Sequence, residues 1–298
     1  LVPWAVRSYP LMGALVLLTN VGSAAFHPSA TGAAASLSRR RVGFMIAVLL
    51  AGGYLGYSLS QVLFSAVYEP APFFTPVIAL LPLGMAAAIA AGLPTVREPC
   101  RSSGFDWRSL RGHLGPLAPL VAVQTLASAV NVSLIFLLPD LLVSRHAAPW
   151  IVRGGGHFAL IAGGCLSLVP AGQASDRWGG RRMLVFANLT TALALGLLLT
   201  RGGASTLDLV FVMAVGAFNG INNIAAVAEG NRLLPGQASG VSALLMGLPW
   251  SIAALGPVIA GVLADPARGG TPAGALGWFM LIMPLGLAAS LRVQPRRD

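Results

Sequence analysis

A short polar stretch, Gly172-Gln173-Ala174-Ser175-Asp176-Arg177-Trp178-Gly179-Gly180-Arg181-Arg182, interrupts an otherwise apolar region of the sequence. The runs beside it, 155–174 and 183–201, each hold about 20 predominantly apolar residues, which is the length at which an α-helix crosses a bilayer. Gly179 and Gly180 permit a tight reversal of the chain. The arginines can pair with a carboxylate or with lipid phosphate. The stretch therefore predicts two spanning helices joined by a short turn.

The rest of the chain repeats this pattern of apolar runs and short polar gaps. Hydrophobic residues make up 56% of the 298 residues and charged residues only 9%, whereas a soluble domain carries about 25% charged residues. A soluble chain this poor in charge could not cover its own surface, so we predict an all-α integral membrane protein. Nine runs are long enough to span: 11–36, 42–68, 74–94, 114–143, 155–174, 183–201, 206–229, 238–263 and 273–292.

The charged residues alternate between the gaps. All 19 basic residues are arginines. Fourteen lie in alternate gaps: Arg39, Arg40, Arg41, Arg97, Arg101, Arg108, Arg111, Arg177, Arg181, Arg182, Arg232, Arg292, Arg296 and Arg297. The other five are Arg7, Arg145, Arg153, Arg201 and Arg268. Cytoplasmic loops carry the excess of basic residues, so we expect a multi-pass protein of the plasma (inner) membrane with a cytoplasmic C-terminus. The charge forms no basic face, which argues against a nucleic-acid partner.

The longest polar gap, 95–113, separates three spans from six. Its Pro, Ser, Gly and Arg content predicts a cytoplasmic linker between a helical bundle at 1–94 and a six-helix bundle at 114–298. The segment 81–87 resembles 283–289, as expected for transporters built from internal repeats. Nine spans place Leu1 outside, which predicts that an odd number of N-terminal helices is missing.

The stretch 172–182 is similar to the G-x-x-x-D-R-x-G-R-R loop of the major facilitator superfamily. Its physical reading is that Gly172 permits close helix contact, while Asp176 accepts hydrogen bonds from the N-terminus of a neighbouring helix, where the dipole favours an anion. We predict that Glu229, at the end of its span, pairs with Arg177 or Arg181 and latches the cytoplasmic side. An ordinary positive-inside loop would need the arginines but not this order of Gly and Asp.

A closer resemblance links 22–28, 233–247 and 255–265 to the fosmidomycin-resistance-like efflux family. It implies a major facilitator fold in which the nine spans are helices four to twelve of twelve. It also implies a monomeric secondary active transporter, coupled to protons, that exports a small organic solute or drug by alternating access. The family has Glu after its His-Pro pair, whereas this chain has Ser29, which leaves a histidine–carboxylate proton relay in doubt.

Several polar residues lie within the predicted spans, where an ionisable group is costly and suggests function. Histidine can gain or lose a proton near neutral pH, so His27, close to mid-membrane, could couple transport to protons. A neutral histidine that is hydrogen-bonded between helices would explain the residue equally well. Uncharged amides could line a substrate cavity or join helices by hydrogen bonds. The candidates for a substrate or proton pathway are His27, Asn20, Gln124, Asn131, Asn219 and Asn223. Pro28, Gly256 and Pro257 are candidates for helix packing or bending, although a tolerated kink explains them equally well.

Other classes of function find less support. No phosphate-binding loop with Lys is present, and no His, Cys or Asp residues have metal-ligand spacing, so we expect no cofactor and no metal. A membrane-embedded enzyme would need convergent catalytic groups, and His27 has no adjacent acid in sequence. We therefore expect that the chain is not an enzyme. A non-functional transporter fragment remains the alternative, because half of one bundle would be absent.

Overall fold

The computed structural model describes residues 8–38, 40–92, 111–201 and 206–295. Within these ranges every regular element is a helix, and no strand occurs. The elements are α2 (Tyr9–Ser36), α3 (Val42–Tyr68), η1 (Pro72–Ala79), α4 (Leu80–Gly92), α6 (Leu114–Ser144), η2 (Ile151–Gly155), α7 (Gly156–Trp178), α8 (Gly180–Thr200), α9 (Thr206–Leu233), η3 (Pro235–Gln237), α10 (Ala238–Ala253), α11 (Leu255–Ala264), η4 (Pro266–Arg268), α12 (Pro272–Met280) and α13 (Met283–Arg292). Most of the predicted linker 95–113 lies outside the described residues.

The nine predicted spans are confirmed as helical segments of sufficient length and apolarity to cross a membrane. Among the described residues there are nine such segments, from Tyr9–Ser36 to Pro272–Arg292, each with at least 21 residues. Four of them consist of consecutive shorter helices, namely η1 with α4, η2 with α7, η3 with α10 and α11, and α12 with α13. The fold class is therefore that of a helical protein with the proportions of a multi-pass membrane protein.

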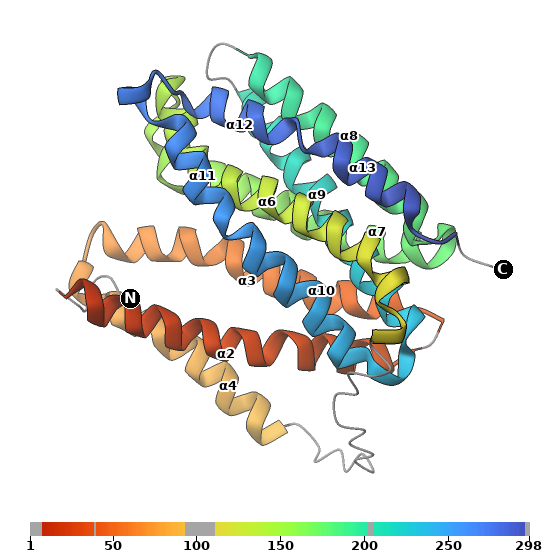
Figure 1. Cartoon of the computed structure of the whole chain (residues 1–298). Coiled ribbons are helices and arrows are strands. Elements are labelled where there is room, and N and C mark those ends of the chain that lie inside the picture. The colour runs from red at the N-terminus through yellow and green to blue at the C-terminus, as the bar shows by residue number, and fades with distance from the viewer. Residues whose placement is uncertain (1–7, 39, 93–110, 202–205, 296–298) are drawn as a thin grey trace.

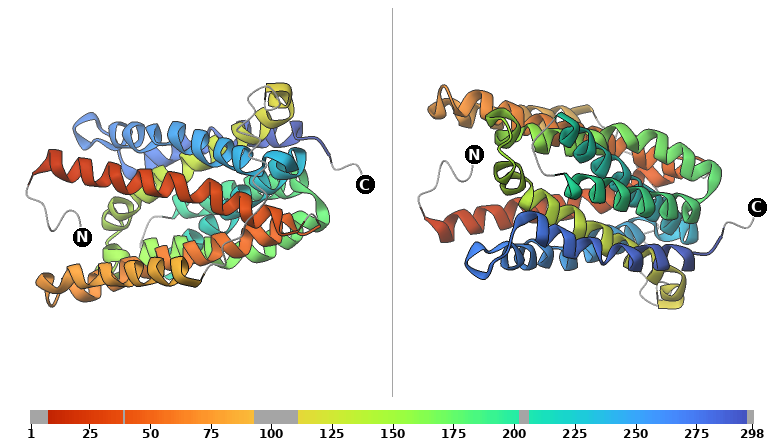
Figure 2. Two further views of the ribbon diagram at one scale, coloured as in Figure 1. Left: turned by 90° about the horizontal axis from the view of Figure 1, so that it is seen from below. Right: turned by 90° about the horizontal axis from the view of Figure 1, so that it is seen from above.

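The spans run roughly parallel to one long axis and form two groups (Figures 1 and 2). The first group is α2, α3, η1 and α4, and the second group is α6 to α13. Helix α3 packs along α7, and α2 packs on α10, so these two pairs join the groups. In the first group the described side chains of α4 are exposed to the surroundings.

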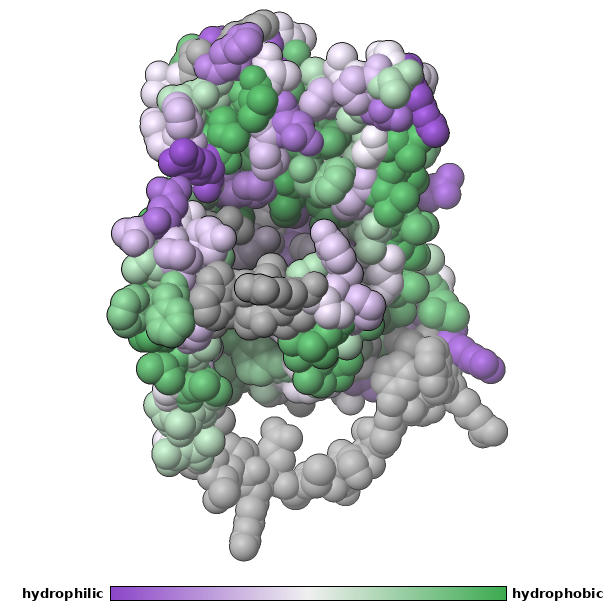
Figure 3. Space-filling model, turned by 90° about the vertical axis from the view of Figure 1, so that its left-hand side faces the viewer, coloured by the Kyte–Doolittle hydropathy of each residue, from purple (hydrophilic) through white to green (hydrophobic). Residues whose placement is uncertain are grey.

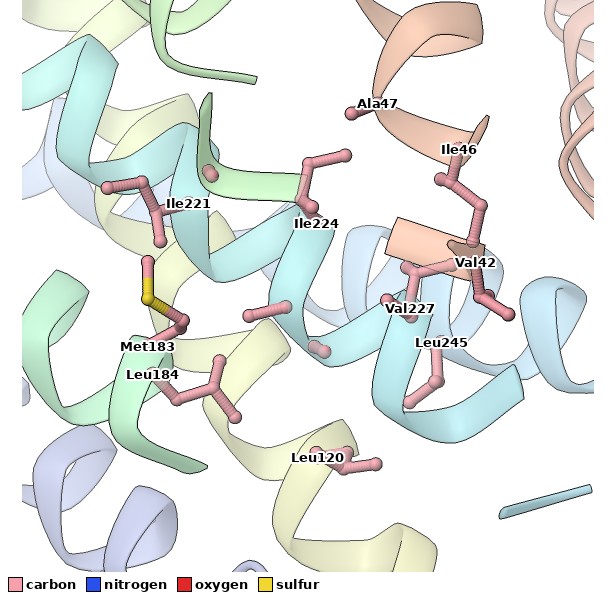
Figure 4. Packing of buried hydrophobic residues seen from close by; sticks show 14 of the residues in the cluster. Val42, Ile46, Ala47, Leu120, Met183, Leu184, Ile221, Ile224, Val227 and Leu245 are labelled. Atoms are coloured by element: carbon pink, nitrogen blue, oxygen red, sulfur yellow. The ribbon is translucent and has the colours of Figure 1, made fainter. Parts of the chain in front are cut away.

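The two groups share a hydrophobic core at one end only. One buried cluster contains Val42 and Ile46 from α3, together with residues of α6, α8, α9 and α10 such as Ile224 and Leu245 (Figure 4). A second buried cluster is built from the second group, and it includes no described residue of α2, α3 or α4. Burial of apolar side chains therefore holds the first group to the second near the start of α3.

The same asymmetry appears along α2. Its buried residues, Thr31, Gly32, Ala34 and Ala35, all lie in its last two turns, where the helix contacts α10. The residues from Ser8 to His27 are exposed or half-exposed, and α2 and α11 diverge at that end of the molecule (Figure 1). Seen from this end, the surface is recessed between the two groups (Figure 3).

The two ends of the helices also differ in charge. We call the end that holds the turn 172–182 the Arg-rich end. Its described arginines are Arg40, Arg41, Arg111, Arg177, Arg181, Arg182, Arg232 and Arg292, and its described carboxylates are Asp176 and Glu229. At the opposite end, the number of described arginines equals the number of described carboxylates: the arginines are Arg145, Arg153, Arg201 and Arg268, and the carboxylates are Glu69, Asp140, Asp208 and Asp265. The excess of positive charge is therefore confined to the end that holds the turn 172–182. At the opposite end an exposed ion pair, Arg153 with Glu69 at 3.4 Å, also links the two groups.

Candidate functional site

Asp176 caps the N-terminus of α3 from the end of α7. Its Oδ1 accepts a hydrogen bond from the Gly43 amide at 2.9 Å, and its Oδ2 accepts one from the Phe44 amide at 2.9 Å. These amides are among the first N–H groups of α3, which have no partner within their own helix. The helix dipole adds to the attraction for the carboxylate. The hydrogen-bonding geometry expected for Asp176 is thus confirmed, and it joins the first group of helices to the second.

Close backbone contact makes this cap possible. A Cβ atom on Gly172 would lie 2.5 Å from the Gly43 carbonyl oxygen and 2.7 Å from the Ala47 Cβ. A Cβ atom on Gly43 would lie 2.7 Å from the Gly172 carbonyl oxygen and 3.0 Å from the Asp176 Oδ1. Both positions therefore need glycine for α3 and α7 to approach to this distance. Gly43 was not singled out from the sequence.

Arg232, at the end of α9, completes a network with two carboxylates. One of its terminal nitrogens, Nη2, pairs with the Asp176 Oδ1, and the other, Nη1, lies 3.0 Å from the Glu229 Oε2. Glu229 Oε2 also accepts a hydrogen bond of 3.3 Å from the Gly180 amide, at the start of α8. We call Asp176, Glu229 and Arg232, with the helix N-termini that they contact, the charge latch.

The predicted ion pair of Glu229 with Arg177 or Arg181 is wrong. Among the described residues Glu229 forms its ion pair with Arg232, whereas Arg177 and Arg181 line a groove on the outer surface. The reason is the position of Glu229, which is buried beneath the turn and faces the Gly180 backbone. A Cβ atom on Gly180 would lie 2.7 Å from the Glu229 Oε2. The spacing of Glu229 and Arg232, three residues apart on one helix face, could have indicated the true partner.

The turn between α7 and α8 depends on Gly179. Its φ is 86° and its ψ is 152°, a conformation that is open essentially to glycine alone. Gly179 ends α7 and precedes α8, and its amide donates to the Ser175 carbonyl at 3.1 Å. The tight reversal expected for this glycine is present, and it holds Asp176 and Gly180 on the two sides of the charge latch.

A chain of polar side chains crosses the middle of the structure. Gln124 on α6 donates from its Nε2 to the Asn223 Oδ1 on α9 at 3.0 Å. Tyr54 of α3 lies near the Asn223 side chain, and the Tyr54 ring packs against Gly164 of α7. The structure thus brings together two of the predicted residues and adds Tyr54, which the sequence alone did not indicate.

Two acceptors, one in this polar chain and one a helical turn before Asn223 on α9, have no hydrogen-bond partner among the described residues. They are the buried Oε1 of Gln124 and the buried Oδ1 of Asn219. A buried acceptor left unsatisfied costs about 1–3 kcal/mol, so both atoms favour a hydrogen-bond donor in the working protein. Asn131 lies two turns from Gln124 on the same face of α6 and is half-buried.

The predicted residues of α2, Asn20 and His27, lie on one face of the helix. Nearer the Arg-rich end, the same face packs against α10. Thr31 donates from its Oγ1 to the Met246 sulfur of α10 at 3.5 Å. At about 100° of rotation per residue, Asn20 and His27 lie within about 40° of Thr31 around the helix. Both are exposed, because α2 and α11 have diverged at that level. His27 has an edge-on ring contact with Phe26 at 5.8 Å, and Asn20 donates to the Val16 carbonyl of its own helix.

A second set of amides joins helices of the second group. Asn188 on α8 donates to the Asn222 Oδ1 at 3.0 Å, to the Ser290 Oγ of α13 at 3.1 Å and to the Leu184 carbonyl at 2.9 Å. All of these side chains are buried. Asn222 therefore faces away from Asn223 and Gln124. Sequence spacing alone could not show that Asn222 joins helices whereas the adjacent Asn223 belongs to the central polar chain.

The three candidates for helix packing or bending take different positions. α2 continues through Pro28. The span from Pro235 to Ala264 is interrupted at Ala254, and Pro257 lies in the first turn of the helix that follows. A Cβ atom on Gly256 would lie 2.6 Å from the Ser133 Oγ and 3.1 Å from the Ala129 carbonyl oxygen. Gly256 thus lies directly against α6.

The end opposite the charge latch is held by a buried ion-pair cluster that the sequence analysis missed. Asp208, at the start of α9, lies 3.6 Å from the Arg145 Nη1 and 3.3 Å from the Arg201 Nε. Arg145 also donates to the Leu198 carbonyl at the end of α8 at 2.8 Å. These contacts tie together α6, α8 and α9, which all belong to the second group.

Comparisons with known proteins do not assign the chain to a family, since no family model and no curated protein matches it. Within the part of the chain that the structure describes, no three His, Cys, Asp or Glu side chains gather as ligands for a metal ion. The features that bear on function are the charge latch, the central polar chain and the arrangement of the two groups of helices.

Proposed function

We propose that this chain forms part or all of a secondary active transporter that works by alternating access. The single observation that carries the proposal is the one-ended contact between α2 and the second group. Apolar burial and the charge latch close the Arg-rich end, while α2 and α11 diverge at the other end. Two groups of helices joined in this way can rock against each other around a central site.

The polar chain lies where such a site is needed. Gln124, Asn219 and Asn223 come from the second group, and Asn20 and His27 lie on the α2 face that turns toward the gap between the groups. The open acceptors on Gln124 and Asn219 suit a solute that carries hydrogen-bond donors. Uncharged amides around an apolar gap fit a small organic solute better than a strongly charged one.

The direction and coupling of transport follow from the resemblance and from His27. We infer proton-coupled efflux, with His27 as the group that exchanges protons. By the excess of arginines, the Arg-rich end and the C-terminus are cytoplasmic in a plasma (inner) membrane. The arrangement described above is then the state open to the outside. A major facilitator fold accounts for the two groups and for the turn 172–182 between α7 and α8.

Proteoliposomes test this function. The purified protein is reconstituted into vesicles that contain a pH-sensitive dye, an inside-acid gradient is imposed, and small phosphonates, lipophilic cations and aromatic acids are added in turn. We expect at least one solute to accelerate the loss of the gradient relative to protein-free vesicles. His27→Gln should remove this acceleration, whereas His146→Gln, an exposed histidine outside the spans, should keep it. Equal rates with and without protein for every solute would contradict the proposal.

A further inference from the structure

The outer side of the turn 172–182 carries a groove that the charge latch does not use. Its volume is about 660 Å³, and it lies between the α7–α8 turn, the first half of α8 and the end of α13. Three arginines, Arg177, Arg181 and Arg182, line it together with Trp178. The groove is at the Arg-rich end, on the outside of the second group.

The three guanidinium groups have no carboxylate within ion-pair distance among the described residues. The two described carboxylates at the same end, Asp176 and Glu229, face inward and are paired with Arg232. The groove therefore presents three positive charges without compensation from the described protein. Groups of this charge and geometry bind phosphate oxygens well, because each guanidinium offers several donors in a fixed plane.

Below the arginines the groove becomes apolar. Arg182, Phe186 and Leu189 recur at the three- and four-residue spacing that defines one face of α8, and Leu291 of α13 forms the opposite wall. Phe186 and Leu189 are about half exposed, at 47% and 52%. The Phe186 ring is held by an edge-on contact with Phe218 of α9 at 5.9 Å. A stripe of this kind is suited to a hydrocarbon chain.

We propose that this groove binds an anionic phospholipid of the leaflet at the Arg-rich end. The headgroup phosphate lies among Arg177, Arg181 and Arg182, and an acyl chain lies along Phe186 and Leu189. Trp178 lines the same groove, and tryptophan is enriched at membrane–water interfaces. A soluble phosphate would use the arginines but not the stripe. The proposal requires only that α8 spans the membrane, so it does not depend on transport.

Quenching of Trp178 fluorescence by brominated lipid tests the proposal. The full protein and its Trp178→Phe variant are reconstituted into one fixed mixture of phosphatidylglycerol and phosphatidylcholine, with bromine on either lipid. The difference between the two proteins reports the lipid beside Trp178, and the surface charge of the vesicles is the same in both arms. We expect phosphatidylglycerol to be preferred over phosphatidylcholine by at least tenfold, after correction for mole fraction.

Variants with fewer charges decide which arginines are responsible. Each basic residue near an anionic surface contributes roughly a fivefold increase in affinity. Arg177→Gln, Arg181→Gln and Arg182→Gln together should therefore abolish the preference, and Arg182→Gln alone should lower it about fivefold. The single variant alters one exposed side chain and decides the matter if the triple variant does not fold. The matched control replaces Arg40, Arg41 and Arg111 with Gln at the same end, and it should keep the preference.

Three results would overturn the proposal. The first is equal quenching by both brominated lipids. The second is an equal loss of preference in the control variant, which would indicate general attraction to the surface. The third is displacement of phosphatidylglycerol by millimolar glycerol phosphate, which would identify the groove as a site for soluble phosphate.

Discussion

Asp176 is the residue on which the contact between the two groups depends most directly. It receives two backbone amides of α3 and the guanidinium of Arg232, and hydrogen bonds to a charged group contribute about 1.5–3 kcal/mol. The sequence could predict this capping role, because Asp176 is a carboxylate at the end of a span, where the free amides of a neighbouring helix N-terminus are its natural hydrogen-bond donors. It could not predict Arg232, which is 56 residues away and meets Asp176 only through the packing of α7 on α9.

Neutralising Asp176 should open the Arg-rich end. Thr31 is fully buried against α10, so a cysteine at that position reports the opening in a Cys100→Ser, Cys165→Ser background. Asp176→Asn should raise the rate at which Thr31→Cys reacts with a membrane-impermeant maleimide by roughly 10- to 100-fold, the equivalent of the lost interaction. Asp140→Asn, at an exposed carboxylate of the opposite end, should leave the rate unchanged. An unchanged rate in Asp176→Asn would contradict the role of the charge latch.

Substitutions in the two sets of amides, one around Gln124 and one around Asn188, should have different effects on transport and on stability. Gln124→Leu should lower flux in the proteoliposome assay at least tenfold, because Gln124 has an acceptor free for a solute, and its effect on stability should not exceed the loss of its one hydrogen bond to Asn223. Asn188→Leu should instead lower stability by about 1–2 kcal/mol, because it breaks interhelical hydrogen bonds in the second group. Flux and thermal melting in detergent check both. A large stability loss in Gln124→Leu with normal flux would identify that residue as a packing element.

At the scale of helices, prolines set where the composite spans divide. α4, α11 and α13 each carry a proline within their first three residues, namely Pro82, Pro257 and Pro284. The missing N–H costs little in the first turn of a helix, because the amides there have no partner in the helix anyway. The sequence predicted the outer limits of these spans well. It could not predict the breaks, because a bilayer protein can also carry proline inside a continuous helix, as α2 does at Pro28.

The contact between α3 and α7 should be sensitive to a single methyl group. Gly172→Ala would place a Cβ 2.5 Å from the Gly43 carbonyl oxygen, which is backbone and cannot move aside without shifting the helix. We expect a destabilisation of about 1–3 kcal/mol and a lower melting temperature. The control Gly53→Ala, on α3, has no atom within 4 Å of its new Cβ and should be neutral or stabilising by up to about 1 kcal/mol. Equal effects of the two substitutions would contradict this packing.

In the whole molecule, the distribution of charge and the packing of the helices both distinguish the Arg-rich end from the opposite end. The alternation of arginines predicted a difference between the two ends. The structure sharpens it, because the described arginines of the opposite end are matched by an equal number of carboxylates. The position of α2 and α11 could not be predicted from the sequence, because their apolar faces suit lipid, a neighbouring helix or an open gap equally well.

Distances between spin labels at the two ends test the central claim, alternating access, most directly. One pair, Val16→Cys and Ile259→Cys, reports the separation of α2 and α11 at the open end. The other, Leu37→Cys and Gly236→Cys, reports the Arg-rich end, with Cys100 and Cys165 replaced by Ser. If the two groups rock against each other, Asp176→Asn shortens the first distance and lengthens the second in the reconstituted protein. Unchanged distances, or distances that change in the same direction at both ends, would contradict it.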